Sequence, residues 1–303
     1  RITHGCLGLY SDDCEAALGR ALAAARRVAG PAKFGIQLAH AGRKASARLP
    51  WEGGRALRDD EDSWPTVSAS ALAFDDGWHV PEALDEDGMA RVTDAFAHAA
   101  RRALHLGFEV IELHSAHGYL LHQFLSPLSN RRDDGYGGLL ANRMRFPLEV
   151  LEAVSAVVPP TTVLGMRISA TDWVESGWTV DDSIEYVRAA QALGIDYVCV
   201  SSAGLTAQAQ VPVSPGYQVP AAARIRAATG LVTRAVGLIT SPRQANAIIA
   251  DGQADQVALA RAFIDDPRWG WHAADELGAE VHCPPQYARA RPASWRALRD
   301  AAS

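Results

Sequence analysis

The chain has 303 residues, of which 48% are hydrophobic and 21% are charged, and its 29 basic and 35 acidic side chains leave a formal net charge of −6. This composition excludes a mainly disordered chain and offers no basic bias for nucleic acid. The longest apolar run, near residues 16–25, is broken by Arg20 and ends at Arg26 and Arg27, so we expect no membrane-spanning helix.

The four cysteines lie far apart, at positions 6, 14, 199 and 283, without the spacing of a zinc or iron–sulfur site. This pattern predicts reduced thiols, no bound metal and a cytoplasmic location. Arg1 stands where a methionine would start a complete chain, and no signal-peptide pattern follows it. We therefore expect the sequence to be incomplete at its N-terminus.

Six short apolar, β-branched runs alternate with amphipathic stretches along the chain. The predicted strands are 34–40, 108–114, 163–169, 196–202, 231–237 and 254–260. The predicted helices are 11–28, 85–106, 142–157, 180–193, 219–228 and 241–250. The stretch 85–106 shows the helical pattern best, because its apolar residues recur every three or four positions.

Strict alternation of strands and helices predicts an α/β fold with parallel strands and right-handed crossovers. An open doubly wound sheet and a (β/α)8 TIM barrel both satisfy it. No GxGxxG follows the first strand, and the polar residues follow the ends of several strands, which favours the barrel. A barrel of about 250 residues has units of roughly 30 each, so about two further βα units would precede Arg1.

The segment from Ala45 to Leu84 differs from the rest, since it is rich in proline and glycine and carries three tryptophans and the acidic run DDED. We expect it to be an ordered loop excursion over the barrel mouth. No linker or low-complexity tract interrupts the chain, so residues 1–303 are predicted to form a single domain.

The richest chemical segment, residues 111–138, leaves a predicted strand with His114, His117 and Tyr119 close together. Imidazole N–H groups can polarise a carbonyl or hold an anion, and a phenol can give a proton to a carbanion. This combination suits a reductive or isomerising site. A structural histidine pair, or a chance metal site, remains the alternative.

Arg167 lies in the apolar strand GMRIS, where a permanent cation needs an anionic or electron-rich partner. The partner could be a ligand or, alternatively, Glu112 on a neighbouring strand. Gln37, in the strand GIQLAH, could pair with the edge of a heterocycle or with backbone.

The last two predicted strands each run into a helix start, the place where this barrel commonly binds phosphate. Gly237 and Arg261 are the candidate donors there. The alternatives are a plain turn glycine and a surface cation.

Taken together, these segments resemble the Old Yellow Enzyme family of FMN-dependent ene-reductases, in particular the xenobiotic reductase and thermophilic-like branch. Six blocks carry the resemblance in order along nearly the whole chain. They are RITHGCLGLYSD (1–12), FGIQLAHAGRKAS (34–46), HSAHGYLLHQFLSPLSNRRDDGYGG (114–138), NRMRFPLEV (142–150), RISATDW (167–173) and LARAFIDDP (259–267).

The resemblance implies an FMN across the barrel mouth, with Gln37 on its pyrimidine edge and Arg167 near N1 and the C2 carbonyl. Ala260 and Arg261 match the phosphate-binding pair, although the family usually has glycine at the first of these positions. It further implies that the two histidines, 114 and 117, bind the substrate carbonyl and that Tyr119 protonates the alkene.

The tail CPPQYARARP resembles one that reaches a neighbouring subunit's active site, with Arg289 in the matching place; an exposed tail cation is the alternative. The resemblance implies a homodimer or homotetramer that uses NADPH or NADH to reduce α,β-unsaturated carbonyl or nitro compounds. The related dienoyl-CoA reductases carry an iron–sulfur cysteine cluster that this sequence lacks. Two rival hypotheses remain, a flavin-free phosphate-binding isomerase or aldolase and a truncated, non-catalytic relative.

Overall fold

The computed structural model of the chain describes residues 1–290, and its centre is a parallel six-stranded sheet. The strand order is β1-β4-β5-β6-β7-β8, so each strand pairs with the next one of the sheet along the chain. The strands are β1 (Gly35–Leu38), β4 (Val110–Ser115), β5 (Val163–Ser169), β6 (Tyr197–Ser201), β7 (Val232–Val236) and β8 (Gln256–Ala258).

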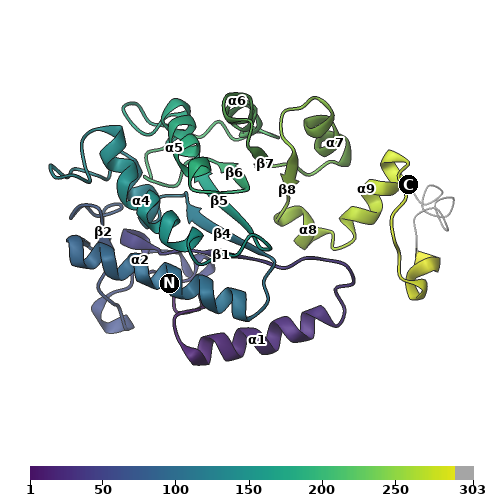
Figure 1. Cartoon of the computed structure of the whole chain (residues 1–303), viewed down its shortest axis with the longest axis horizontal. Coiled ribbons are helices and arrows are strands. Elements are labelled where there is room, and N and C mark those ends of the chain that lie inside the picture. Colours follow the sequence, from purple (N-terminus) through teal and green to yellow (C-terminus); the bar gives the residue numbers. More distant parts are fainter. Residues whose placement is uncertain (291–303) are drawn as a thin grey trace.

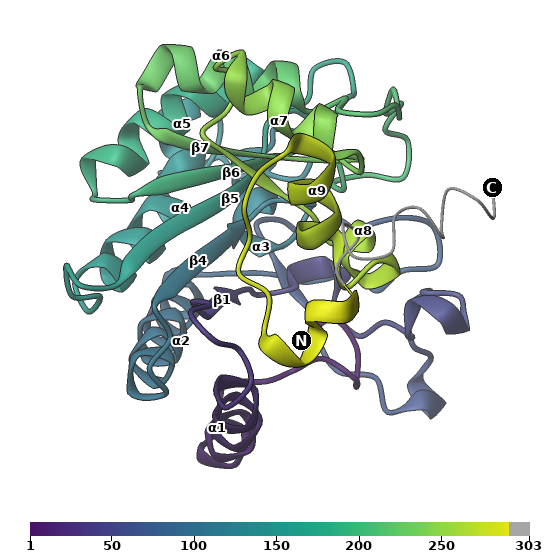
Figure 2. The same ribbon diagram turned by 90° about the vertical axis from the view of Figure 1, so that its right-hand side faces the viewer.

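Helices precede, separate and follow these strands along the chain. They are α1 (Asp12–Arg26), α2 (Glu86–His105), α3 (Leu120–Leu125), α4 (Leu140–Ser155), α5 (Val180–Ala192), α6 (Val219–Thr229), α7 (Pro242–Ala250), α8 (Arg261–Asp265) and α9 (Trp269–Leu277). Figure 1 shows α2, α4, α5, α6 and α7 in an arc around the sheet, and Figure 2 shows the strands fanning out beside them. This is the arrangement of a (β/α)8 barrel, and the described part of the chain contributes the six strands of this sheet to it.

The two faces of the sheet have opposite chemistry because successive side chains of a strand point to opposite sides. On β5, Met166 and Ile168 are fully buried in the hydrophobic core under the helices. Arg167 lies between them and faces the other, concave side. Parallel register places His114 of β4 beside Arg167, and Arg167 beside Cys199 of β6. The polar residues of several strands therefore gather on the concave face.

All six strands and six helices predicted from the sequence are confirmed, with ends that differ by a few residues. Ser11 caps α1 by accepting from the Cys14 N–H at 3.3 Å, and Asp85 caps α2 by accepting from the Gly88 N–H at 2.7 Å. Three short helices, α3, α8 and α9, were missed. All six residues of α3 are buried, so that it lacks an amphipathic pattern, and α8 has only five residues.

The segment from Ala45 to Leu84 is folded through short elements. It follows η1 (Gly42–Lys44) and contains η2 (Pro50–Glu52), η3 (Asp59–Glu61) and the two-residue parallel strands β2 (Val67–Ser68) and β3 (Glu82–Ala83). The carboxylate of Glu61, within the acidic run, binds the guanidinium groups of Arg48 and Arg55. Within residues 1–290, no helix combines the length and the apolar character needed to cross a membrane.

The two faces of β5 predict different costs for truncation. Replacing the fully buried Met166 by Ala should lower the free energy of unfolding by about 2–5 kcal/mol, because a cavity remains in the core. Val163→Ala, at the exposed start of the same strand, should cost less than about 1 kcal/mol. Urea unfolding of both variants makes the comparison. Equal losses would contradict the assignment of the core face.

Candidate active site

Three side chains named from the sequence meet where β4 ends. His114 is 6% exposed near the end of the strand, and His117 follows in a left-handed conformation with φ 55°. Tyr119 is the residue just before α3. The ring of His114 lies edge-on to both others, with centroids 5.0 Å from His117 and 4.9 Å from Tyr119. The structure therefore brings together the three residues proposed to do the chemistry.

Hydrogen bonds assign the protons of the histidine pair. Nδ1 of His114 accepts from the Ala116 N–H at 3.2 Å, so its proton sits on Nε2. That nitrogen lies 3.3 Å from Nδ1 of His117, whose Nε2 lies 2.7 Å from Oγ of Ser201. The pair is thus held in one orientation from both ends.

The network continues across the sheet through residues that the sequence analysis did not single out. Ser201, at the end of β6, donates to Oε1 of Gln218 at 3.3 Å. The amide of Gln218 donates in turn to the carbonyl of Val236 on β7 at 2.8 Å. The histidine pair on β4 is therefore tied to the ends of β6 and β7.

Burial keeps both imidazoles neutral. It lowers the pKa of His114 to about 3, and the charges of Arg167 and Lys44 act in the same direction. Burial likewise lowers the pKa of His117 well below its ordinary value, and His114 adds to the effect. At neutral pH each ring therefore has one N–H donor and one acceptor.

Arg167 lies half-buried beside His114, and its Nε has no hydrogen-bond partner within residues 1–290. No carboxylate of this part of the chain lies within 4.0 Å of it, so the alternative of a salt bridge with Glu112 is wrong. Glu112 instead binds Arg234 at 3.5 Å and accepts from the Tyr197 hydroxyl at 2.8 Å. The guanidinium of Arg167 is left for another partner.

Gln37 lies on β1, opposite Glu112, and is exposed on the concave side. Its amide donates to Oε1 of Glu112 at 2.6 Å. This bond fixes the orientation of the amide and uses one of its two N–H groups, which leaves the other N–H and the amide oxygen to pair with a ligand.

The predicted phosphate-binding residues follow neighbouring strands. Val236 of β7 pairs with Ala258 of β8, so Gly237 and Ala260 come just after paired strand ends. Gly237 has φ 114°, and a Cβ there would lie 2.4 Å from Nε2 of Gln218, so only glycine fits. Ala260 has φ −121°, so this position does not need the left-handed conformation that favours glycine.

Arg261 and Arg289 are not joined to the histidine site by any hydrogen bond or ion pair among residues 1–290. Arg261 is exposed at the start of α8, and Arg289 is exposed in η4 (Pro285–Ala290). The last two residues of the tail, 291 and 292, lie outside the described part. The roles of both arginines stay predictions.

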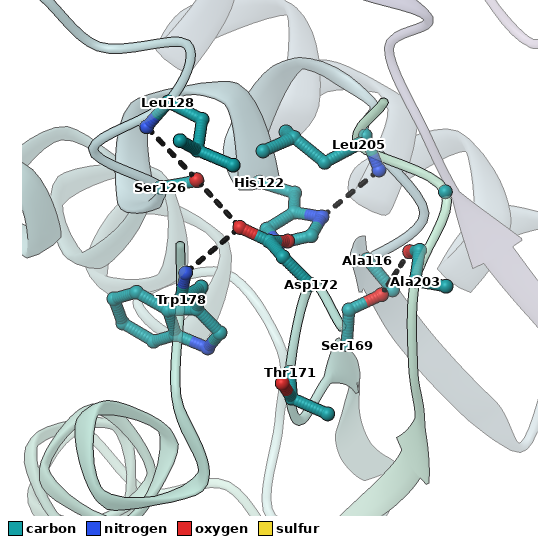
Figure 3. Close-up of polar contacts among 12 residues, drawn as sticks. Ala116, His122, Ser126, Leu128, Ser169, Thr171, Asp172, Trp178, Ala203 and Leu205 are labelled. Atoms are coloured by element: carbon teal, nitrogen blue, oxygen red, sulfur yellow. Dashed lines mark hydrogen bonds and ion pairs between the residues drawn. The ribbon is translucent and has the colours of Figure 1, made fainter. Parts of the chain in front are cut away.

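A buried polar cluster behind the histidine turn was missed from the sequence (Figure 3). Nδ1 of His122 accepts from the Gly118 N–H at 2.9 Å, and its Nε2 lies 3.1 Å from Oδ1 of Asp172. Oδ2 of Asp172 accepts from Ser126 at 2.7 Å and from the Trp178 N–H at 2.8 Å. Burial alone would raise the pKa of Asp172, but these partners lower it. The cluster fixes the turn from inside.

Ser169 fixes the same turn from β5. Its hydroxyl accepts from the His117 N–H at 2.9 Å and donates to the Ala203 carbonyl at 2.8 Å, a bond visible in Figure 3. Both Ser169 and Asp172 lie in the block RISATDW, so the signal was present, but a single sequence does not show which turn the block supports.

Other kinds of site are less well supported. Within residues 1–290, no three His, Cys, Asp or Glu side chains are grouped to hold a metal ion. An open cavity of about 350 Å3 lies against the 45–84 segment and is lined in part by Trp64, His79 and Glu82. None of the candidate catalytic or FMN-binding residues lines it.

Solved structures of similar fold include 2-naphthoyl-CoA reductase in complex with 2-naphthoyl-CoA and morphinone reductase in complex with tetrahydroNAD. The first has a TM-score of 0.78 and 24% identity over 91% of this chain, which spans only 42% of that structure. The second has a TM-score of 0.70 and 26% identity over 92% of this chain and 75% of that structure. The first likeness concerns the fold alone.

Sequence relatives carry the assignment further. The NADPH dehydrogenase of Geobacillus thermodenitrificans (strain NG80-2) is 41% identical over 296 residues, which are 98% of this chain and 80% of that protein. Residues 7–280 match the family described as NADH:flavin oxidoreductase / NADH oxidase. The resemblance to the Old Yellow Enzyme family is confirmed, and the chain belongs to the NADH:flavin oxidoreductase / NADH oxidase family as an FMN-dependent NAD(P)H oxidoreductase.

Proposed function

We propose that the protein is an ene-reductase, which reduces the C=C bond of α,β-unsaturated carbonyl or nitro compounds. The observation that carries this proposal is the meeting of His114, His117 and Tyr119 beside the unpartnered Arg167. Two neutral N–H donors suit a carbonyl or nitro oxygen, and a phenol suits the carbon that must be protonated.

The residues present fit FMN. The unpartnered guanidinium of Arg167 would meet the charge of the reduced ring, and the exposed Gln37 amide would pair with its pyrimidine edge. The backbone at Gly237 and Ala260, together with Arg261, is our proposed phosphate site. When bound, FMN supplies the means to take hydride from the nicotinamide and to pass it to the β-carbon of the alkene.

His114 and His117 would hold the substrate oxygen. Ser201 can donate as well as accept, because a hydroxyl does both. If Ser201 turns its O–H from Oε1 of Gln218 to Nε2 of His117, the proton of that ring moves to Nδ1. The Nδ1–H of His117 and the Nε2–H of His114, now 3.3 Å apart, would then both turn to one oxygen of the substrate. Two donors there would stabilise the enolate or nitronate that forms.

Tyr119 would protonate the α-carbon. Its hydroxyl makes no hydrogen bond within residues 1–290, and its ring is only partly buried. The O–H bond is thus free to point at a substrate that His114 holds at the adjacent ring edge.

The finer assignments follow from the same site and from the relatives. We propose NADPH as the reductant because the curated relatives are NADPH dehydrogenases. We propose a homodimer or homotetramer, with Arg289 meeting the neighbouring subunit, and a cytoplasmic location that suits four free cysteines. The segment 45–84 reaches the site through Phe74, which lies beside Lys44, and we propose that it shapes substrate choice.

The activity is tested in two separate steps under anaerobic conditions. The purified protein should show flavin absorbance, NADPH should bleach it, and cyclohex-2-enone should restore it. A protein that stays colourless and refuses added FMN would support a non-catalytic relative. The rival hypothesis of a flavin-free isomerase or aldolase is excluded, because the chain belongs to a family of flavin oxidoreductases.

The histidine pair should affect reoxidation of the flavin by the enone and not its reduction by NADPH. Changing both His114 and His117 to Ala should slow enone-dependent reoxidation by about 10²- to 10³-fold, because the donors to the developing oxyanion are lost. FMN content and reduction by NADPH should change little. His98→Ala, an exposed histidine on α2, is the matched control. Loss of FMN from the double variant would mean that the pair is structural.

The neutral state of His114 should show in stability. Its folded pKa of about 3 lies below the ordinary 6.5, so between these values the unfolded chain binds a proton that the folded chain does not. The histidine therefore makes the free energy of unfolding fall as pH drops below 6.5, by about 1.4 kcal/mol per pH unit. The free energies of unfolding of wild type and His114→Asn, measured with urea at neutral pH and at about pH 5, isolate this contribution. Parallel pH profiles would show that burial does not lower the pKa of His114.

A further inference from the structure

Lys44 ends the 3-10 turn that follows β1, and its ammonium lies among the residues of the site. Nζ donates to the carbonyl of His117 at 3.0 Å and to that of Gly204 at 2.9 Å. The same atom lies 5.1 Å from the ring centroid of Tyr119 and 4.6 Å from that of Phe74. The cation is thus held in place over the phenol.

The charge of Lys44 is not balanced by a neighbouring carboxylate. Within residues 1–290, none lies within 4.0 Å of Lys44 or of the adjacent Arg43, whose guanidinium binds only carbonyls, at Leu72, Ala73 and Leu205. Burial, with Arg43 adding to it, lowers the pKa of Lys44 to about 8, so the ammonium form still dominates at neutral pH. Burying a cation costs free energy unless an anion or other electron-rich group pairs with it.

The reaction proposed above creates such an anion. When Tyr119 protonates the α-carbon, its O–H bond breaks, the new C–H bond forms with the alkene's π electrons, and the O–H pair stays on the phenolate oxygen. Burial, with Cys6 adding to it, already raises the pKa of Tyr119, which opposes this loss of a proton. The neighbouring His114 is neutral and offers no charge.

We propose that Lys44 is a positioning residue that stabilises Tyr119 as a phenolate while the proton moves to the substrate. The inference rests on the proposed ene-reductase function. The hydride at the β-carbon comes from NADPH by way of FMN, and water returns the proton to Tyr119 afterwards, so no further reactant is needed. The ammonium acts through the phenol and does not touch the substrate.

A purely structural role is the competing explanation, since the ammonium also joins the carbonyls of His117 and Gly204. The two roles differ in whether the effect of Lys44 requires the phenol hydroxyl. A double-mutant cycle with Lys44→Met and Tyr119→Phe measures this dependence. Lys44→Arg restores the charge, and Lys44→Gln keeps a donor for the carbonyls if the Met variant does not retain FMN.

Stopped-flow absorbance of the FMN-loaded variants separates reduction by NADPH from reoxidation by cyclohex-2-enone. We expect Lys44→Met to slow reoxidation by about 10- to 100-fold and to leave reduction within about twofold, because only reoxidation uses the general acid. Lys44→Arg should recover most of the rate. In the Tyr119→Phe background the same change should have an effect of less than about twofold.

The pH dependence of reoxidation gives a second readout. In the wild type the rate should fall as pH rises through about 8, because the ammonium of Lys44 loses its charge there, whereas Lys44→Met should lack this fall. The other titratable groups near Lys44 and Tyr119 are Arg43, His114 and Cys6. Identical pH profiles of wild type and Lys44→Met, or an undiminished effect of Lys44→Met in the Tyr119→Phe background, overturn the inference alone. A wild-type protein that NADPH reduces but enone does not reoxidise overturns the proposed function and this inference with it.

Discussion

The site depends on one close approach of two backbones. A Cβ at Gly118 would lie 2.2 Å from the carbonyl oxygen of Gly204, and a Cβ at Gly204 would lie 2.6 Å from Cα of His117. Both glycines also have positive φ, so no other residue fits without strain. Because the turn after β4 rests directly on the loop after β6, His117 reaches Ser201 and two carbonyls converge on Lys44. The donors and the cation are thus placed by the same contact.

Charge is arranged in layers along the concave face. In the lower layer, the carboxylate of Glu112 is met by Gln37, Tyr197 and Arg234. One layer higher, toward the strand ends, Arg167 and then Lys44 have no carboxylate partner within residues 1–290. Buried cations without counterions are rare because desolvation is costly. Their presence at the strand ends is explained if the ligands there become anionic during turnover.

The sequence predicted the repeating units well because hydrophobic periodicity reports directly on which face is buried. The sequence analysis also named His114, His117 and Tyr119, which lie within six residues of one another in the chain and are therefore close in space. It missed Lys44, Ser201 and Asp172, whose importance comes from contacts between units: Lys44 joins β1 to the turns after β4 and β6. Such contacts depend on the curvature of the sheet, which no local pattern encodes.

The neutral state of the histidines depends in part on their charged neighbours. An imidazolium pair beside Arg167 and Lys44 would concentrate positive charge in a buried space, and those cations are among the causes that lower the pKa of both rings. The rings are thus left as N–H donors, which can polarise an oxygen without giving up a proton. In the proposed mechanism, proton transfer is left to Tyr119, whose hydroxyl makes no hydrogen bond in the described chain. The ring centroids of His117 and Tyr119 lie 5.0 Å and 4.9 Å from that of His114, so the proposed tasks fall to close neighbours. Under that proposal the cations keep the histidines neutral for polarising the substrate oxygen and leave protonation to the phenol.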